Sequence, residues 1–296
     1  MLIIPESMDV LFNAFNACYN EGFSGVESHA KDVALVTNSQ SAQEVYPWLG
    51  QFPGMREWIG DRYLKSLVAY DYFIKNKKFE STVTIPREKI EDDQYGIFAP
   101  VFKQMGRVSA QHPDKELFFL LKNGFTINCY DGRPFFDANH PSFDDQGNQI
   151  TLSNIQDGTG EPWYLLDTKQ PVKPMVWQVR IPYEFTTVTR PDEMSVFLRD
   201  EFAYGIRARV NAGFGFWQCA YSSRQALNAE NFALARAAMA GLRGDQGQIL
   251  GIEGNTLVVS ANLEAQARLL LKATFTSATS NVWFESAKLI VSPFLA

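Results

Sequence analysis

One stretch of this chain, residues 77–141, constrains its fold more than any other. From Phe79 onward, one face of an extended chain carries Phe79, Ser81, Val83 and Ile85, and the other carries Glu80, Thr82 and Thr84. This is the period-two pattern of a half-buried strand. Pro86 ends that strand, and the acidic residues 91–93 place negative charge where a helix would begin. Apolar residues then recur at three- and four-residue spacing: Phe98, Val101, Phe102, Met105 and Val108. The sequence therefore predicts a half-buried strand that leads into an amphipathic helix.

This helical region is expected to consist of two pieces, because proline is unfavourable inside a helix. Pro113 biases His112, the residue before it, away from helical geometry. Asp114 supplies acidic charge to a fresh first turn, and residues 123–124 (Asn-Gly) would form the C-cap. We therefore expect a long helix with a break near Pro113.

The N-terminal region predicts one helix and one short strand. The helix covers residues 5–21, with Pro5 in its first turn and Gly22 just past its end. Residues 33–37 form the strand. The helix would form an N-terminal arm, and the strand would follow it.

The segment that follows is unusually aromatic. Its aromatic residues are Tyr46, Trp48, Phe52, Trp58, Tyr63, Tyr70, Tyr72 and Phe73. A two-stranded extension cannot bury so much aromatic surface on itself, so the segment either folds back on its own domain or packs on a neighbouring molecule. A turn carries Lys75, Lys77 and Lys78, which we interpret as the solvated tip of a hairpin. The alternative is that these lysines pair with an acidic patch on a neighbouring subunit.

The second half of the chain changes from mostly extended to mixed structure. The elements expected there are a polar surface loop over 142–160, a β block over 161–220, a helix over 229–241 capped by Asn228, a strand over 257–260, a helix to residue 272 capped by Ser260, and a strand over 287–292.

Only one kind of nucleophilic site can be assembled from the residue types present. A Cys–His pair would have to join Cys129 to His140 or His112, with Asp131 or Asp137 to orient the histidine. Nothing in the sequence places either histidine beside the thiol. A small Cys-dependent hydrolase is therefore kept as an alternative, and the expected set of catalytic residues is empty.

Other candidate sites have simpler interpretations. The acidic run 91–93 suits a solvated helix start better than a hard-cation site. The glycines in residues 213–217 (GFGFW) lack the third glycine and the strand-to-helix context of a phosphate loop. We expect no cofactor and no metal.

Composition limits the class of protein. A chain of 296 residues with 46% hydrophobic and 20% charged residues is globular, and long enough for one large or two ordinary domains. The formal charge of −6 argues against tight, sequence-independent binding of nucleic acid. The sequence contains no apolar run long enough for a bilayer and no secretion signal, so a cytosolic protein without a membrane is expected. Three scattered cysteines, without a metal-type pair, are expected to stay reduced: Cys18, Cys129 and Cys219.

Several strings resemble, in order, the major head (capsid) subunits of Mu-like tailed phages, the gpT family. They are EWIGDRYLKSLVAYDYFIKNKKFE (57–80), YDGRPFFDANHP (130–141), EPWYLLDTKQPVKPMVWQ (161–178), NAGFGFWQCAY (211–221), LNAENFALARAAM (227–239) and KLIVSPFLA (288–296). None of them is a catalytic signature. The resemblance is carried by their number and order over nearly the full length.

The resemblance implies the α+β tailed-phage major capsid fold. That fold has a peripheral domain with a long spine helix, an axial domain, an N-terminal arm and an extended hairpin loop. The implied parts are an N-terminal arm and first strand (1–44), an extended hairpin loop (45–78), a peripheral domain with the spine helix (79–160), a β block shared by both domains (161–224) and a mainly axial part (225–296).

The resemblance also implies function and partners. It predicts a structural, non-enzymatic protein of the phage head that forms pentamers and hexamers of an icosahedral shell around double-stranded DNA. The negative charge of the chain indicates that this DNA would be held by confinement. The implied partners are other copies of the chain, a separate scaffold protein, a portal and decoration proteins, in the virion and, during assembly, in the host cytoplasm. A non-viral compartment-forming shell protein of the same fold is a further alternative. Contacts between subunits are predicted at Trp48, Phe52, Trp58, Tyr63, Tyr70, Lys75 and Lys77.

The order of the C-terminal blocks looks exchanged relative to the wider class, as in a circular permutation. This requires the strand over 287–292 to finish near Trp163, where the first strand of the β block is expected to begin.

Overall fold

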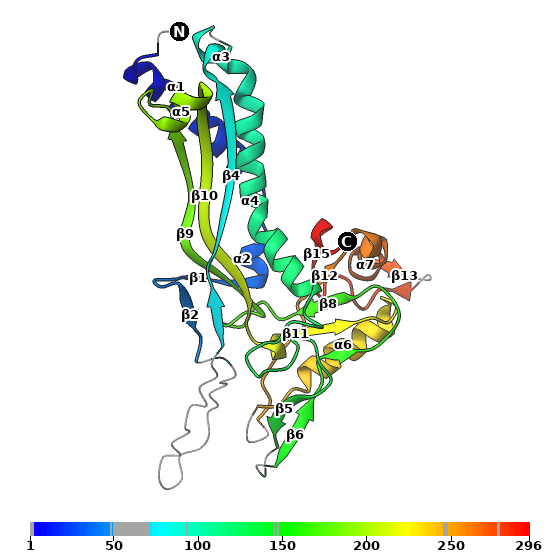
Figure 1. Cartoon of the computed structure of the whole chain (residues 1–296). Coiled ribbons are helices and arrows are strands. Elements are labelled where there is room, and N and C mark those ends of the chain that lie inside the picture. The colour runs from blue at the N-terminus through cyan, green and yellow to red at the C-terminus, as the bar shows by residue number, and fades with distance from the viewer. Residues whose placement is uncertain are drawn as a thin grey trace.

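The computed structural model describes residues 3–47, 49, 72–92, 94–144, 146, 148–244, 248–276 and 279–296. Two larger sheets organise these residues, a long one at one end of the molecule and a shorter one near the C-terminus (Figure 1). Among the described residues, no helix carries an apolar stretch long enough to cross a bilayer.

The long sheet has four strands. Their order is β1 (Ala34–Asn38), β9 (Met175–Val188), β10 (Glu201–Phe214) and β4 (Lys77–Pro86). β1 runs parallel to β9, and the other pairs are antiparallel. β4 contains the predicted strand and pairs with β10 from Pro86↔Glu201 to Lys77↔Val210. Short α5 (Met194–Arg199) connects β9 to β10.

Two long helices, α1 (Pro5–Ser24) and α4 (Ala99–Lys122), pack with this sheet in one hydrophobic cluster (Figure 1). The ring of Phe15 stacks on that of Phe102 with centroids 4.1 Å apart, and both rings meet Tyr204 of β10 edge-on. Such aromatic geometry adds to the free energy gained by burial alone. Between β4 and α4 the chain forms α3 (Arg87–Glu91) and the 3-10 turn η1 (Tyr95–Phe98).

The two helices cross at backbone contact. A Cβ atom on Gly22 would lie 2.0 Å from the Lys103 carbonyl oxygen, and one on Gly106 would lie 2.0 Å from that of Tyr19. Gly22 is therefore an interior residue of α1, which ends at Ser24, and the expectation that Gly22 follows the helix was wrong. Its role is close packing and not capping.

The expected break near Pro113 was also wrong, because α4 is continuous from Ala99 to Lys122. Proline inside a helix costs about 3 kcal/mol. The turns after Pro113 bury three large side chains almost completely, those of Leu117, Phe118 and Leu121, and each contributes about 1.5–3 kcal/mol. The free energy gained by burying these side chains therefore exceeds the cost of the proline.

Asp114, expected to start a second helix, instead binds the loop that follows α1. Its carboxylate accepts a hydrogen bond from Ser28 Oγ at 2.7 Å and another from the backbone N–H of His29 at 3.0 Å. His29 directly precedes the short helix α2 (Ala30–Val33).

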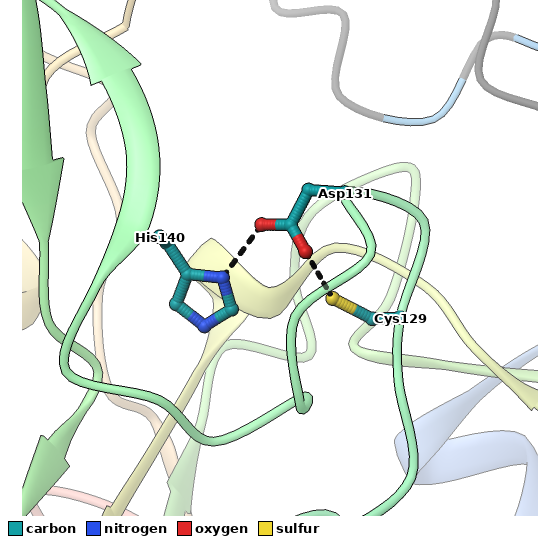
Figure 2. A group of neighbouring side chains, drawn as sticks. All are labelled: Cys129, Asp131 and His140. Atoms are coloured by element: carbon teal, nitrogen blue, oxygen red, sulfur yellow. Dashed lines mark hydrogen bonds and ion pairs between the residues drawn. The ribbon is translucent and has the colours of Figure 1, made fainter.

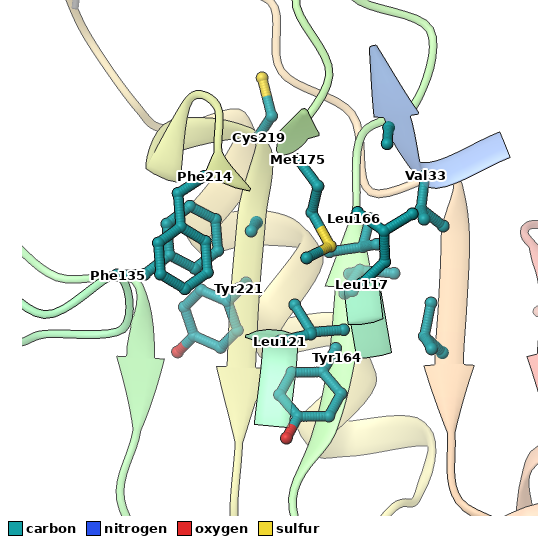
Figure 3. Close-up of a cluster of buried hydrophobic side chains, with 14 of the residues drawn as sticks. Val33, Leu117, Leu121, Phe135, Tyr164, Leu166, Met175, Phe214, Cys219 and Tyr221 are labelled. Carbon is teal, nitrogen blue, oxygen red and sulfur yellow. The ribbon is translucent and has the colours of Figure 1, made fainter. Parts of the chain in front are cut away.

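The second sheet has five strands. Their order is β15 (Lys288–Val291), β12 (Thr256–Val259), β8 (Trp163–Leu166), β11 (Ala220–Ser223) and β7 (Ile155–Gln156). Every residue of β8, β11 and β12 is buried, as expected of strands covered on both faces. Figure 3 shows part of the core around this sheet, in which Leu117 and Leu121 of α4 lie among residues of β8 and β11.

Two helices accompany the second sheet, α6 (Ala229–Ala240) and α7 (Glu264–Lys272). The predicted cap of α6 is confirmed, because the Asn228 side chain accepts a hydrogen bond from the backbone N–H of Asn231. The predicted cap of α7 was wrong. A 3-10 turn, η3 (Ala261–Leu263), precedes α7, and the buried Ser260 hydroxyl has no hydrogen-bond partner within the described ranges.

Residues 142–160, expected as a surface loop, contain strands. β5 (His140–Phe143) and β6 (Gln149–Leu152) form an antiparallel hairpin, and β7 follows. Asp144 favours the turn of this hairpin, because its carboxylate accepts the backbone N–H groups of Gln146 and Asn148. The remaining short elements are β2 (Gln43–Val45), β3 (Phe73–Lys75), η2 (Trp217–Cys219), β13 (Phe275–Thr276), β14 (Thr279–Ser280) and η4 (Pro293–Leu295).

The predicted β block contributes to both sheets, β8 and β11 to the second and β9 and β10 to the first. Only β12 lies between the end of β15 and the start of β8 in this sheet. Val291 of β15 pairs with Val259 of β12, and the neighbouring Val258 pairs with Tyr164 of β8. The proximity that a permuted order requires is therefore present. The permutation itself stays a prediction.

Candidate functional site

The residues predicted to contact neighbouring subunits divide into two groups. Five of them lie outside the described residues: Trp48, Phe52, Trp58, Tyr63 and Tyr70. The other two, Lys75 and Lys77, are exposed on either side of the buried Asn76.

Strands β2 and β3 form the root of a hairpin. They pair antiparallel from Gln43↔Lys75 to Val45↔Phe73, which holds together the two ends of the segment 46–72. We call that segment the hairpin arm and the β2–β3 pair with Asn76 the hairpin root. Lys75 ends β3 and Lys77 begins β4, so the lysine cluster lies at the root and its interpretation as the tip was wrong.

The second candidate is the thiol site, and three of its predicted members do meet (Figure 2). The Cys129 thiol donates to Asp131 Oδ1 at 3.1 Å, and His140 Nδ1 lies 2.6 Å from Asp131 Oδ2. All three side chains are largely buried, and the His140 ring is stacked 4.0 Å from that of Trp217. The carboxylate therefore stands between the sulfur and the imidazole.

This order does not suit nucleophilic catalysis. A thiol is activated when a base takes its proton or a positive charge lowers its pKa. Here burial, followed by the negative charge of Asp131, raises the pKa of Cys129 far above its usual range. Burial opposes ionisation of Asp131 as well, yet the hydrogen bond and charge of His140 hold the pKa of that carboxyl below its usual range. The cluster is a protonated thiol and an imidazole bound to one carboxylate.

The same three side chains offer possible ligand atoms to a metal ion, since one atom of each lies within 4.8 Å of the others. A metal would need the thiolate, whereas the Cys129 proton is held in a hydrogen bond to Asp131. Both oxygens of Asp131 already accept hydrogen bonds, Oδ1 also from the backbone N–H of Arg133. Within this cluster, only His140 Nε2 has no hydrogen-bond partner among the described residues. Because the thiol proton and both carboxylate oxygens are engaged, the donor set fits a hydrogen-bonded cluster better than a metal centre.

The other members of the predicted thiol site have different surroundings. His112 lies 2.7 Å from the Tyr183 hydroxyl and packs against Phe79. Asp137 accepts the backbone N–H of Asn139 in a local turn. All three cysteines belong to the described residues and are free thiols there, as expected.

Gln178 is a feature that the sequence analysis missed. This fully buried residue of β9 is hydrogen-bonded to Tyr46, Ile74 and Asn76, all at or beside the hairpin root. The available signal was a polar residue at the end of the apolar run MVW. Its partners were not predictable, because they lie 102 to 132 positions away in the chain.

The chain is similar to head proteins of Mu-like phages. The family described as "Mu-like prophage major head subunit gpT" matches residues 8–295. The major capsid protein of Escherichia phage Mu is 38% identical over 305 residues, covering all of both chains. The Mu-like prophage FluMu major head subunit of Haemophilus influenzae is 38% identical over 277 residues, which is 91% of this chain and 90% of that one.

Solved structures of phage capsids are also similar to this chain. A chain of the procapsid of bacteriophage JBD30 has a TM-score of 0.87 and 39% identity, covering 99% of this chain and all of that one. A chain of the JBD30 capsid has a TM-score of 0.80 and 30% identity, with 92% of each chain covered. The chain therefore belongs to the Mu-like gpT family of major head subunits, has the tailed-phage major capsid fold, and is a structural protein of the phage head and not an enzyme.

Proposed function

We propose that copies of this chain assemble, through the hairpin arm, into pentamers and hexamers of an icosahedral head that encloses double-stranded DNA. The observation that carries the proposal is the antiparallel pairing of β2 with β3, which holds together the two ends of an aromatic-rich segment. Family membership supplies the kind of assembly, because the solved relatives are chains of a procapsid and a capsid.

The arm has more aromatic side chains than a two-stranded extension can bury. Tryptophan and tyrosine are also the residues most enriched among interface hot spots. We infer that Trp48, Phe52, Trp58, Tyr63 and Tyr70 contact a neighbouring subunit, with Lys75 and Lys77 at the exposed root beside that contact.

The charge of the chain favours enclosure of DNA by confinement. Tight binding of nucleic acid depends on Lys and Arg side chains that neutralise phosphates and release their counterions. A chain with a formal charge of −6 gains little affinity in this way. We therefore expect DNA inside the shell to be held by the closed wall. A nuclease-protection assay on purified heads, in buffers of rising salt, should show protection that does not weaken as salt rises.

The remaining partners follow from the family. One solved relative is the JBD30 capsid decorated with minor capsid protein trimers, and we propose an equivalent decoration protein for this chain. A scaffold protein and a portal are proposed on the same basis. We also propose that the long sheet with α1 and α4 is the peripheral domain and that the second sheet is the main part of the axial domain.

The arm is tested by replacing Trp48 and Trp58 together with alanine. We expect the double variant to remain a soluble, folded subunit with the circular dichroism of the wild type but to form no shells in negative-stain images or in sedimentation. The matched control, Trp48→Phe with Trp58→Phe, keeps aromatic surface and should retain assembly. Normal shells from the alanine variant would show that the arm is not an essential contact.

A further inference from the structure

The hairpin root is fastened to the long sheet by one buried side-chain amide. Gln178 Oε1 accepts a hydrogen bond from the Tyr46 hydroxyl at 2.6 Å, on the chain that leaves the body. Gln178 Nε2 donates to the Ile74 carbonyl oxygen at 3.1 Å and to Asn76 Oδ1 at 2.8 Å, on the chain that returns. One amide therefore holds both sides of the hairpin.

Asn76 extends this connection to the loop before β2. Its Nδ2 group donates to Ser39 Oγ at 2.8 Å and to the Ser41 carbonyl oxygen at 2.9 Å. Glu44 fixes the same loop, because its Oε1 accepts the backbone N–H groups of Gln40 and Ser41. These hydrogen bonds lower the pKa of Glu44, so the carboxylate stays ionised and keeps accepting them at neutral pH.

Packing prevents the root from shifting toward β10. A Cβ atom on Gly213 would lie 2.1 Å from Ile74 Cδ1, so the β3 side chain sits directly on the β10 backbone. The Tyr72 hydroxyl accepts the backbone N–H of Phe214 at 2.8 Å, and Asn211 Nδ2 donates to the Lys75 carbonyl oxygen at 2.8 Å. The root is held against β10 as well as β9.

A buried amide is costly unless its hydrogen bonds are made, and hydrogen bonds are directional where apolar contacts are not. Gln178 is fully buried, and both of its Nε2 protons have acceptors. An apolar side chain there would fill the same space without fixing the angle of the hairpin.

We propose that Gln178 is a positioning residue for assembly, which sets the direction in which the hairpin arm leaves the subunit. The inference rests on the proposed function, in which the arm contacts a neighbouring copy. A shell closes only when each contact has the correct rotation between copies, so an arm aimed in a variable direction produces open or irregular products.

The test replaces Gln178 with methionine, which has nearly the same shape and cannot form these bonds. We expect the yield of closed shells per folded subunit to fall about fivefold, the factor that corresponds to the loss of one net hydrogen bond. Limited proteolysis of the isolated subunit should cleave within residues 46–72 faster than in the wild type. Tyr46→Phe, a milder change at one end of the same contact, should reduce assembly in the same direction.

The matched control is Asn154→Leu in the region of the second sheet. Asn154 is a fully buried amide that donates to the Phe135 carbonyl oxygen and accepts the backbone N–H of Asp137, so its loss disturbs a comparable set of bonds, none of which is made by Gln178, Tyr46 or Asn76. We expect this variant to lose thermal stability to a similar degree but to keep the wild-type shell yield per folded subunit.

The outcomes separate this inference from the proposed function. If the Trp48 and Trp58 alanine variant assembles normally, the arm contact itself is wrong. If that variant is blocked while Gln178→Met and Tyr46→Phe both assemble like the wild type, only the role of Gln178 is overturned. Equal losses in Gln178→Met and Asn154→Leu would also overturn it, because the effect would then be one of general stability.

Discussion

At the scale of single residues, burial decides what the titratable side chains can do. Cys129 is held protonated by an apolar environment and an adjacent carboxylate, so a residue type that is often a nucleophile serves here as a hydrogen-bond donor. Asp131 accepts from the thiol and lies within hydrogen-bond distance of an imidazole, which places the turn after α4 against the start of β5. The chemistry of this cluster is structural.

His112 should make stability depend on pH. Burial, followed by the charge of Lys115, lowers the pKa of His112 to about 4, although the Glu116 carboxylate lies 3.8 Å from Nε2. Between about pH 6.5, the unfolded value, and about pH 4 the unfolded chain binds a proton that the folded chain does not, so the free energy of unfolding falls as pH falls.

The loss due to this residue should be at most about 3 kcal/mol. Urea unfolding of the wild type and of His112→Gln between pH 7 and pH 4 measures it. The variant should lose less stability than the wild type over this range. Parallel curves for the two proteins would contradict the role of His112.

At the scale of elements, the contact between α1 and α4 depends on the absence of side chains at Gly22 and Gly106. Gly106→Ala should force the helix backbones apart and lower the free energy of unfolding by about 1–3 kcal/mol, the usual cost of overpacking. Gly96→Ala is the control, because a Cβ atom at that position meets nothing within 4 Å in the described part of the chain. Chemical denaturation of both variants checks the difference, and equal stabilities would refute the close crossing.

How far the sequence predicts an element depends on whether its signal is local. Strand β4 was predictable because one of its faces is mostly apolar and partly buried and the other is polar, which produces a period-two pattern in neighbouring residues. The continuity of α4 through Pro113 was not, since it depends on Leu117, Phe118 and Leu121 packing against residues distant in the chain. The hairpin of β5 and β6 was hidden by its polar composition.

The candidate sites follow the same division. Cys129, Asp131 and His140 were named from residue types, but only the structure shows that the carboxylate lies between the other two. The aromatic composition of the arm could be read directly, whereas Gln178 could not be connected to it without the fold.

At the scale of the whole molecule, α4 belongs to both hydrophobic cores. Phe102 and Met105 lie in the cluster with α1, and Leu117 and Leu121 lie in the cluster around the second sheet. One rigid helix shared by two cores should make their unfolding cooperative.

Phe102→Ala tests this coupling. It should lower the free energy of unfolding by about 3–5 kcal/mol. The buried Trp163 and Trp217 of the second core contribute to the tryptophan fluorescence. If the two cores unfold together, the midpoint measured by fluorescence should shift as far as the midpoint measured by circular dichroism. Val101→Ala, at a partly exposed neighbouring position, should shift neither. A fluorescence midpoint that stays in place in Phe102→Ala would show that the two cores unfold independently.

The route of the chain from the hairpin root into β4 has a mechanical consequence. Only Asn76 separates β3 from β4, and β4 is paired to β10 over ten residues, from Lys77 to Pro86. The hydrogen bonds of such a ladder run perpendicular to the strands. A force that pulls the arm along the direction of β4 therefore acts on all of these bonds at once, in shear, and does not break them one after another. Tension applied at the arm is therefore carried along the sheet to α3 and the start of α4, at the opposite end of the subunit (Figure 1).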